Sequence, residues 1–168
     1  YMFRKNVSRE QEWLQSGYRY ALALTHHTQD AEDAVQTACL KLYSTYGRLK
    51  SKTLLFKAIR NLVIDQHRHH AVVEFQALEE HHHLIEPQTP TQQWYGVAAD
   101  IDRLLERLRP EEREVLYLHI VEGYTAREIG KFTRHPRNTV LSLLHRGKRK
   151  LQEALSTEVD TLSAESDI

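Results

Sequence analysis

The clearest chemistry in the sequence lies between Arg134 and Lys150, a stretch with six Lys or Arg residues and no Asp or Glu. Such a run of cations binds phosphate groups and releases their counterions, which favours nucleic-acid binding and not bond-making chemistry. Asn138 adds an amide that suits the edge of adenine, and arginine suits guanine O6 and N7. The stretch therefore predicts a surface that contacts DNA.

A helical wheel separates this stretch into two faces. The apolar stripe, which predicts the buried side of a helix that begins near Pro136, consists of Val140, Leu143, Leu144, Gly147 and Leu151. The remaining face and its flanks hold the candidate DNA contacts Arg137, Asn138, Thr139, Ser142, His145, Arg146, Lys148 and Arg149. Lys150 is also expected to flank this face and to position phosphate.

Two shorter helices should position the cationic one. The first opens at Pro110, where Glu111 and Glu112 make a favourable helix start, and the second runs from about Thr125 to Phe132. A short helix, a tight turn and a cationic helix form the layout of a helix-turn-helix. A basic helix on its own is more often a solvated surface, but the preceding elements favour DNA reading.

Helical spacing of apolar residues continues through most of the chain. Helices are expected up to Thr25, from Asp30 to Gly47 and from Leu54 to His70. We predict an all-α protein of two small helical domains joined by a flexible linker, the second with the helix-turn-helix. The first domain is expected at residues 1–75, the linker at residues 76–99 and the second domain at residues 100–155. A frayed acidic tail is expected at residues 156–168. Both domains are basic, and the acidic linker and tail bring the formal net charge to zero.

Several functional classes lack support in the sequence. No nucleophile elbow, P-loop or dinucleotide fingerprint occurs, so we expect no enzyme and no cofactor, although a hydrolase built on scattered His and Asp stays open. Histidines 67, 69, 70 and 81–83 lack the spacing of zinc ligands, so no metal site is expected. The single cysteine, Cys39, fits a reducing compartment. Without a membrane-length apolar run or a signal-peptide core, we expect a cytoplasmic protein with no membrane partner.

Four motifs of the second domain carry a resemblance to a known family. They are Leu108-Arg-Pro-Glu-Glu-Arg-Glu-Val-Leu, Val121-Glu-Gly-Tyr-Thr-Ala-Arg-Glu-Ile-Gly, Asn138-Thr-Val and His145-Arg146. Together they resemble region 4 of the bacterial extracytoplasmic function (ECF, group 4) sigma factors of the sigma-70 family. In that family the module reads the −35 promoter element and touches the flap of the polymerase β subunit. The resemblance implies those roles for the helix from Pro136 to Lys150.

The first domain resembles region 2.2 of the same family. Asp30-Ala-Glu-Asp-Ala-Val-Gln36, followed by Leu40, is similar to the helix that docks on the coiled coil of the polymerase β′ clamp. The resemblance implies that core polymerase is bound by Asp30, Glu32, Asp33, Gln36 and Leu40. Taken alone, such an acidic helix start is more often ordinary complementation of the helix dipole.

A second part of this domain resembles regions 2.3 and 2.4, which open the −10 element and capture a flipped base. The matching residues are Phe56-Lys-Ala-Ile-Arg-Asn61, Asp65 and His67-Arg68. A pocket for an extruded base needs polar groups and an apolar or aromatic wall, and many relatives carry Trp where Leu54 stands. The implied −10 contacts are Arg48, Lys50, Lys52, Lys57, Arg60, Asn61, Asp65 and Arg68.

The chain departs from the family at three positions of the helix-turn-helix. The family usually has basic residues where Leu141 and Leu143 stand, and a glycine where Arg134 stands. Because a non-glycine residue in a left-handed turn costs about 1 kcal/mol, we expect this turn to adopt another geometry. The loss of two basic groups should weaken phosphate binding or change the sequence that is read.

The resemblance spans about residues 10–155 and predicts a sigma factor. Its implied partners are core RNA polymerase, through the β′ clamp and the β flap, and promoter DNA, with an anti-sigma protein as a further candidate. The alternative is a sigma-like regulator that binds core polymerase or an anti-sigma protein without melting promoters. Exposed leucines at 141 and 143 would favour this alternative, since exposed apolar residues often mark protein contacts.

Overall fold

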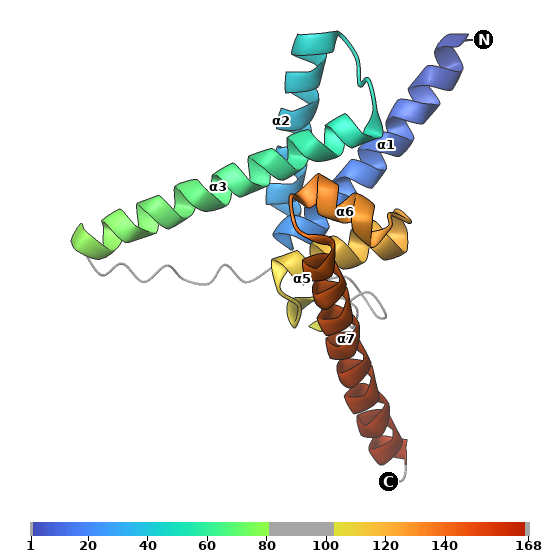
Figure 1. The fold of residues 1–168 in the computed structure, drawn as a ribbon, viewed down its shortest axis with the longest axis vertical. Helices are drawn as coiled ribbons and strands as arrows, with labels where there is room; N and C mark the ends of the chain where they lie inside the picture. The colour runs from blue at the N-terminus through green and yellow to red at the C-terminus, as the bar shows by residue number, and fades with distance from the viewer. Residues whose placement is uncertain (1, 81–102, 167–168) are drawn as a thin grey trace. The chain divides into compact units, whose positions relative to one another are not determined.

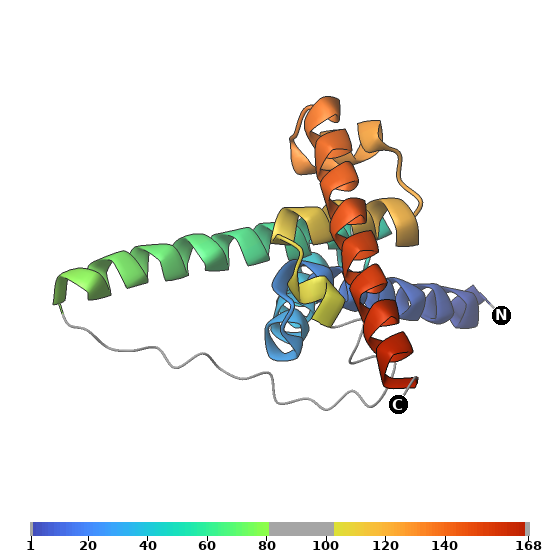
Figure 2. The ribbon, with the colours of Figure 1, turned by 90° about the horizontal axis from the view of Figure 1, so that it is seen from below.

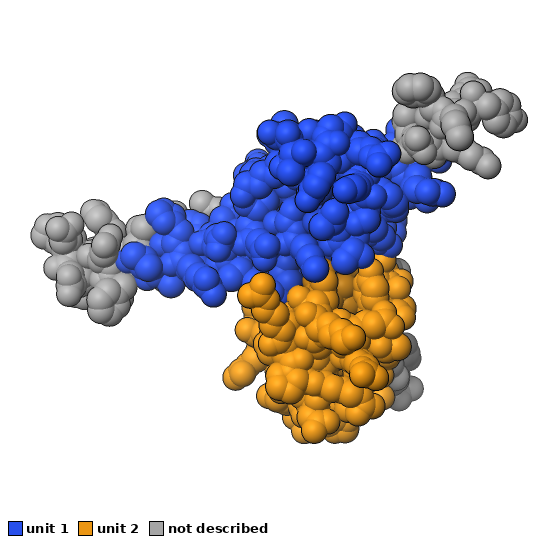
Figure 3. Space-filling view, turned by 45° about the horizontal axis from the view of Figure 1, so that its top comes forward, with its two compact units in different colours: residues 1–91 blue, residues 92–168 orange. Residues whose placement is uncertain are grey.

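The computed structural model describes the backbone of residues 2–80 and 103–166 and the side chains of residues 8–72 and 103–157. Within these ranges all regular structure is helical and no strand occurs, which confirms the predicted all-α class. The chain divides into two compact units, Tyr1–Thr91 and Gln92–Ile168 (Figure 3). Most of the predicted linker, from residue 81 to residue 99, lies outside the described residues. No helix of the described part has both the length and the apolar character needed to cross a lipid bilayer.

Unit 1 consists of three helices that pack against one another: α1 (Met2–Thr25), α2 (Thr28–Tyr46) and α3 (Lys52–Glu80) (Figures 1 and 2). Small residues of α2, such as Ala31, Ala34 and Ala38, are buried and let its backbone approach its neighbours closely. At the centre, the ring of Tyr20 stacks on that of Phe56 with centroids 4.6 Å apart. This core leaves the other faces of α2 and α3 open to solvent.

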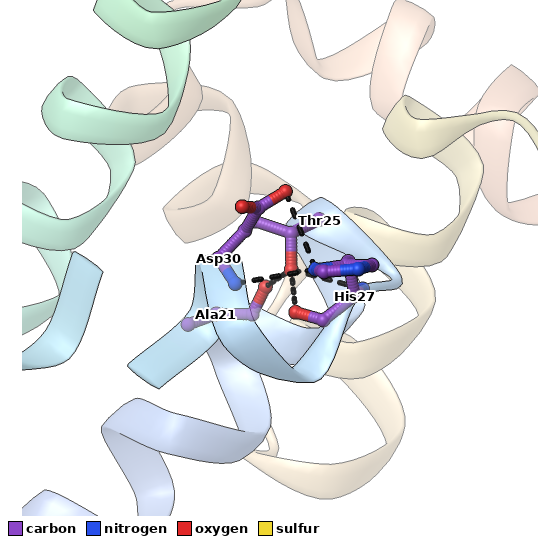
Figure 4. Close-up of polar contacts among 4 residues, drawn as sticks. All are labelled: Ala21, Thr25, His27 and Asp30. Atoms are coloured by element: carbon purple, nitrogen blue, oxygen red, sulfur yellow. Dashed lines mark hydrogen bonds and ion pairs between the residues drawn. The ribbon is translucent and has the colours of Figure 1, made fainter. Parts of the chain in front are cut away.

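Side-chain hydrogen bonds set the junction between α1 and α2 (Figure 4). The Thr25 hydroxyl oxygen lies 2.8 Å from the carbonyl oxygen of Ala21 and accepts a hydrogen bond from the main-chain N–H of His27. His26 turns the chain with a φ of 51°. The Nδ1 of His27 then accepts a hydrogen bond from the main-chain N–H of Asp30 at 3.3 Å and caps α2. These contacts fix the start of α2 and hence which of its residues point outward.

Glycine ends α2 as the sequence predicts. Gly47 has a φ of 70°, and its N–H donates to the carbonyl of Tyr43, which is the left-handed arrangement that favours glycine at a helix end. The Ser51 hydroxyl oxygen then accepts a hydrogen bond from the N–H of Leu54 at 3.2 Å and starts α3. Residues 47–51, which include Arg48 and Lys50 and are called the basic loop below, therefore form a short connection between α2 and α3.

The helix α3 continues through Glu80, ten residues beyond the end expected at His70. Neither Gly nor Pro occurs between Gly47 and Pro87, so no residue forces the helix to stop at position 70. Residues 71–80, part of which we assigned to the linker, thus extend the helix of the first unit.

Unit 2 contains α5 (Pro110–Leu116), a π-helical segment η1 (Tyr117–Val121), α6 (Ala126–Thr133) and α7 (Arg137–Ser166). Pro110 is at the start of α5, as predicted. The helices α5 and α6 both pack on α7, and their shared core includes Val115, Ile129 and Val140. At Gly147 an added Cβ would lie 2.7 Å from a terminal carbon of Leu116, so glycine permits α7 to approach α5 closely.

The C-terminal segment that we expected to be frayed is helical as far as Ser166. After Gly147 the sequence contains no Gly or Pro, and the helix formers Leu, Gln, Glu and Ala dominate the next two turns. The hydroxyls of Ser156 and Thr157 donate to carbonyls one turn earlier, each at 2.9 Å. The predicted end of this helix was too early because it was judged from the composition of the segment, which is acidic and rich in Ser and Thr.

Candidate nucleic-acid and protein interfaces

The helix α6, the turn of residues 134–136 and the start of α7 form the predicted helix-turn-helix. Thr125 caps α6 by accepting a hydrogen bond from the N–H of Glu128 at 3.2 Å. Arg134 ends α6 in the left-handed conformation, with φ 59° and ψ 39°, so our expectation of another turn geometry is wrong. The N–H of His135 donates to the carbonyl of Gly130 at 2.9 Å, which holds the turn closed.

Gly130 lets the turn pack closely against α6. A Cβ added at Gly130 would lie only 2.7 Å from the carbonyl oxygen of His135, which is a backbone atom and cannot rotate away. The glycine therefore lets the turn fold directly over α6, while Arg134 carries a backbone strain of about 1 kcal/mol. The turn thus has a left-handed residue although that residue is not a glycine.

The outward face of α7 holds the predicted −35 contacts together. The exposed members are Arg137, Asn138, Ser142, His145, Arg146, Lys148 and Arg149. Thr139 is only partly exposed, and the buried stripe contains Val140, Leu143, Leu144 and Gly147, as the helical wheel predicts. The Nε of Arg149 lies 3.7 Å from a carboxylate oxygen of Glu153, and both side chains are exposed, so this pair is weak and leaves Arg149 available. One face of one helix thus carries cations, an amide and an imidazole.

Lys150 has a different role from the phosphate contact that we expected. Its Nζ lies 2.8 Å from the Oε1 of Glu112, whose side chain is 1% exposed. The second carboxylate oxygen, Oε2, has no hydrogen-bond partner in the structure. A buried carboxylate with one partner depends strongly on that partner. Lys150 therefore joins α7 to α5 inside the unit.

The two leucines at unusual positions differ in exposure. Leu143 is 8% exposed and belongs to the core, whereas Leu141 is 39% exposed on the outward side of α7. The expectation that both leucines are exposed is therefore wrong for Leu143. One apolar side chain, not a pair, lies on the cationic face.

The predicted −10 contacts on α3 gather on one face. Lys57, Asn61, Asp65 and Arg68 follow one another at steps of four, four and three residues, and all are exposed. Arg60 lies beside this face and is partly buried. The face combines cations with an amide and a carboxylate, which can hydrogen-bond the edge of an unpaired base.

The basic loop before α3 contributes two exposed cations and an aromatic ring. Arg48 and Lys50 are exposed, and the Nζ of Lys50 lies 4.9 Å from the ring centroid of Tyr46. Lys52 instead lies over Phe56, a core residue, at 5.6 Å and is partly buried. Tyr46, which is 45% exposed, was not among the predicted contacts. Its signal was an aromatic residue placed directly before a glycine and a run of cations.

The outward face of α2 holds four of the five predicted polymerase contacts. Exposed side chains at helical spacing along this face are Glu32, Asp33, Gln36 and Leu40. Leu40 is 72% exposed, and Tyr43, one turn further, continues the face. An exposed leucine beside carboxylates suits a protein partner with apolar and basic groups.

Asp30 and Tyr43 are tied to neighbouring side chains. The Oδ2 of Asp30 lies 3.6 Å from the Nδ1 of His27 in the first turn of α2, and Asp30 is exposed one turn before Asp33. The Tyr43 hydroxyl donates to the Oε2 of Glu10 at 2.7 Å, and this hydrogen bond raises the pKa of Tyr43. Tyr43 therefore stays neutral and links α2 to α1.

Neither metal ligands nor a reactive thiol stand out in the described residues. No group of three or more His, Cys, Asp or Glu side chains within them could hold a metal ion. Burial, and then the nearby charge of Glu10, raise the pKa of the Cys39 thiol, so the less reactive protonated form is favoured. The histidines at 81–83 lie outside the described residues.

Comparisons with known proteins match both units to one family. A model of sigma-70 region 2 matches residues 9–72, and a model of sigma-70 region 4 matches residues 98–151. The ECF RNA polymerase sigma factor SigE of Mycolicibacterium smegmatis is 29% identical over 146 residues, which cover 83% of this chain. The chain spans 57% of the length of that relative.

A solved structure has the same fold. It is the sigma factor RpoE from Bartonella quintana, crystallised with the anti-sigma factor NepR. The match has a TM-score of 0.70 at 23% sequence identity and covers 90% of this chain and 98% of that one. Since the two family models together cover well over half of the sequence, this chain belongs to the sigma-70 family, of which it carries regions 2 and 4.

Proposed function

We propose that this chain is an ECF (group 4) sigma factor that binds core RNA polymerase and directs it to promoters with matching −10 and −35 elements. The observation that carries the proposal is the outward face of α7, where Arg137, Asn138, His145 and Arg146 are exposed together on the second helix of a helix-turn-helix. That helix enters the major groove in proteins of this architecture. The chain then acts as a dissociable specificity subunit of the cytoplasm and not as a catalyst.

In this proposal, three surfaces of the chain bind three different targets. Residues 100–155 read the −35 element through α7, and residues 1–75 hold the other two surfaces. The outward face of α2 binds the β′ clamp coiled coil of the polymerase, supported by its carboxylates and by the exposure of Leu40. The loop before α3 and the exposed face of α3 bind the −10 element, supported by the alignment of Lys57, Asn61 and Asp65. The Bartonella quintana sigma factor RpoE was crystallised with an anti-sigma factor, and we include an anti-sigma protein among the partners together with the β flap.

Promoter-selective transcription tests the proposal. Purified core bacterial polymerase would transcribe fragmented host DNA with and without the full-length chain, and new transcript starts would be mapped. We expect starts that lie downstream of a shared pair of DNA elements. Core binding without new starts would support the sigma-like regulator, and absence of both would contradict the proposal.

Charge reversal on α2 should weaken assembly with the polymerase. Asp33→Lys places a cation where the proposed partner surface is basic, so we expect the Kd for core polymerase to rise about tenfold, equivalent to roughly 1.4 kcal/mol. Titration of labelled chain with core polymerase measures this Kd. Glu12→Lys makes the same charge change at an exposed position of α1 and should have a much smaller effect. Equal effects of the two variants would contradict the docking surface.

Two alanine variants of α7 should separate phosphate binding from base reading. Arg149→Ala should lower the affinity of the holoenzyme for all promoters about equally and reduce the salt slope by about one unit. Arg146→Ala should instead relax the choice of one −35 base, because arginine discriminates bases by roughly 1–3 kcal/mol. Binding to a set of single-base promoter variants at several salt concentrations measures both effects. Unchanged selectivity in Arg146→Ala would remove that residue from the reading face.

A further inference from the structure

Leu141 is an exposed apolar residue on the cationic side of the recognition helix. It lies in the second turn of α7, one turn after Arg137 and one turn before His145. We propose that Leu141 reads the 5-methyl group of a thymine in the −35 element. This inference rests on the proposed function of α7 and adds a specificity contact at a position where the family usually carries a cation.

The neighbours of Leu141 identify the partner as DNA. Helical spacing places Arg137, Asn138, His145 and Lys148 around it, and all four are exposed. An apolar protein surface that covered Leu141 would also remove water from two cations without pairing them, which costs free energy. A DNA groove offers phosphates to the cations and base edges to the amide and the imidazole.

The major groove contains one apolar group that matches leucine. Thymine presents its C5-methyl group there, whereas the other edges present hydrogen-bond donors and acceptors. The first turns of a recognition helix lie nearest the base edges, which is where Leu141 stands. Because Leu143 is buried at 8% exposure, it cannot make a second contact of this kind. One methyl-dependent position is therefore expected in the −35 element.

Base analogues test this contact directly. The full-length chain, assembled with core polymerase, would bind a promoter identified by the transcription experiment in which each −35 thymine is replaced, one at a time, by deoxyuridine. Uracil lacks the methyl group and keeps the same hydrogen-bonding edge. We expect one position at which the replacement weakens binding about fourfold, equivalent to about 0.8 kcal/mol at 1.4 kcal/mol per tenfold. Leu141→Ala should abolish the difference between thymine and uracil at that position.

A matched leucine on the same helix provides the control. Leu155 is 50% exposed and lies beyond the basic segment, so Leu155→Ala should keep the full fourfold difference. The inference is overturned if no position depends on the methyl group, or if Leu141→Ala retains the dependence. It is also overturned if Leu141→Ala weakens only the binding of core polymerase. Loss of all promoter selectivity in the unmodified chain would instead contradict the proposed function itself.

Discussion

Lys150→Met is expected to destabilise the helix-turn-helix unit by about 2–3 kcal/mol. Breaking a buried ion pair typically costs roughly 3–5 kcal/mol, and the 31% exposure of the Lys150 side chain lowers that expectation because water replaces part of the lost contact. Glu112 would be left with two unpaired oxygens, since its Oε2 already has no hydrogen-bond partner and its side chain is 1% exposed. The free energy of unfolding should fall accordingly.

Hydrogen exchange of the α7 amides, followed by mass spectrometry on the full-length chain, localises the effect to this unit. Lys148→Met is the matched control, because Lys148 is an exposed cation of the same helix. It should leave exchange unchanged but reduce the salt slope of promoter binding by about one unit. The variant at Lys150 should thus change the stability of the unit, and the variant at Lys148 should change only the affinity for DNA.

A double variant shows whether the ion pair is the cause. Replacing Glu112 by Gln in the Lys150→Met background removes the unpaired buried charge, so it should recover part of the lost stability. If the single variant exchanges as slowly as the unmodified chain, Lys150 is dispensable for the fold and regains its place among the phosphate contacts.

Local signals in the sequence were sufficient for most helix starts and, to within one residue, for the ends of α1, α2 and α6. Pro110 starts α5 and Gly47 ends α2, since each has a backbone preference that acts without distant partners. The ends of α3 and α7 were placed too early because composition changes there without any residue that stops a helix. Acidic or His-rich segments remain helical when their backbone hydrogen bonds can continue.

The roles of individual side chains depended on contacts between distant residues. Lys150 looks like its basic neighbours in the sequence, and its partner Glu112 is 38 residues away. Arg134 adopts the left-handed conformation although it is not a glycine, which its single-residue preference does not predict. The helical wheel placed Leu143 in the buried stripe correctly, but the family comparison suggested exposure, and the packing of α7 decided between them.

Tyr46→Ala is expected to weaken capture of the unpaired −10 strand about five- to hundredfold. Stacking of a base on an exposed aromatic ring contributes roughly 1–3 kcal/mol, and Tyr46 is 45% exposed at the start of the basic loop. Lys50, with its Nζ 4.9 Å from the ring centroid, places a cation within reach of the phosphate of a stacked base. We therefore expect Tyr46, and not Leu54, to supply the aromatic wall of a base pocket.

Two DNA probes distinguish stacking from general binding. The holoenzyme would bind a promoter fragment whose −10 element is single-stranded, and a fully paired fragment with the same sequence under conditions that prevent melting. Tyr46→Ala should weaken binding of the first probe far more than binding of the second, whereas Tyr46→Phe should keep both, because stacking needs the ring and not the hydroxyl. Equal losses on the two probes would mean that Tyr46 supports the fold of the loop and does not hold a base. If Phe failed to replace Tyr, the hydroxyl would be the contacting group, and the −10 surface would have to be rebuilt around a hydrogen bond at this position.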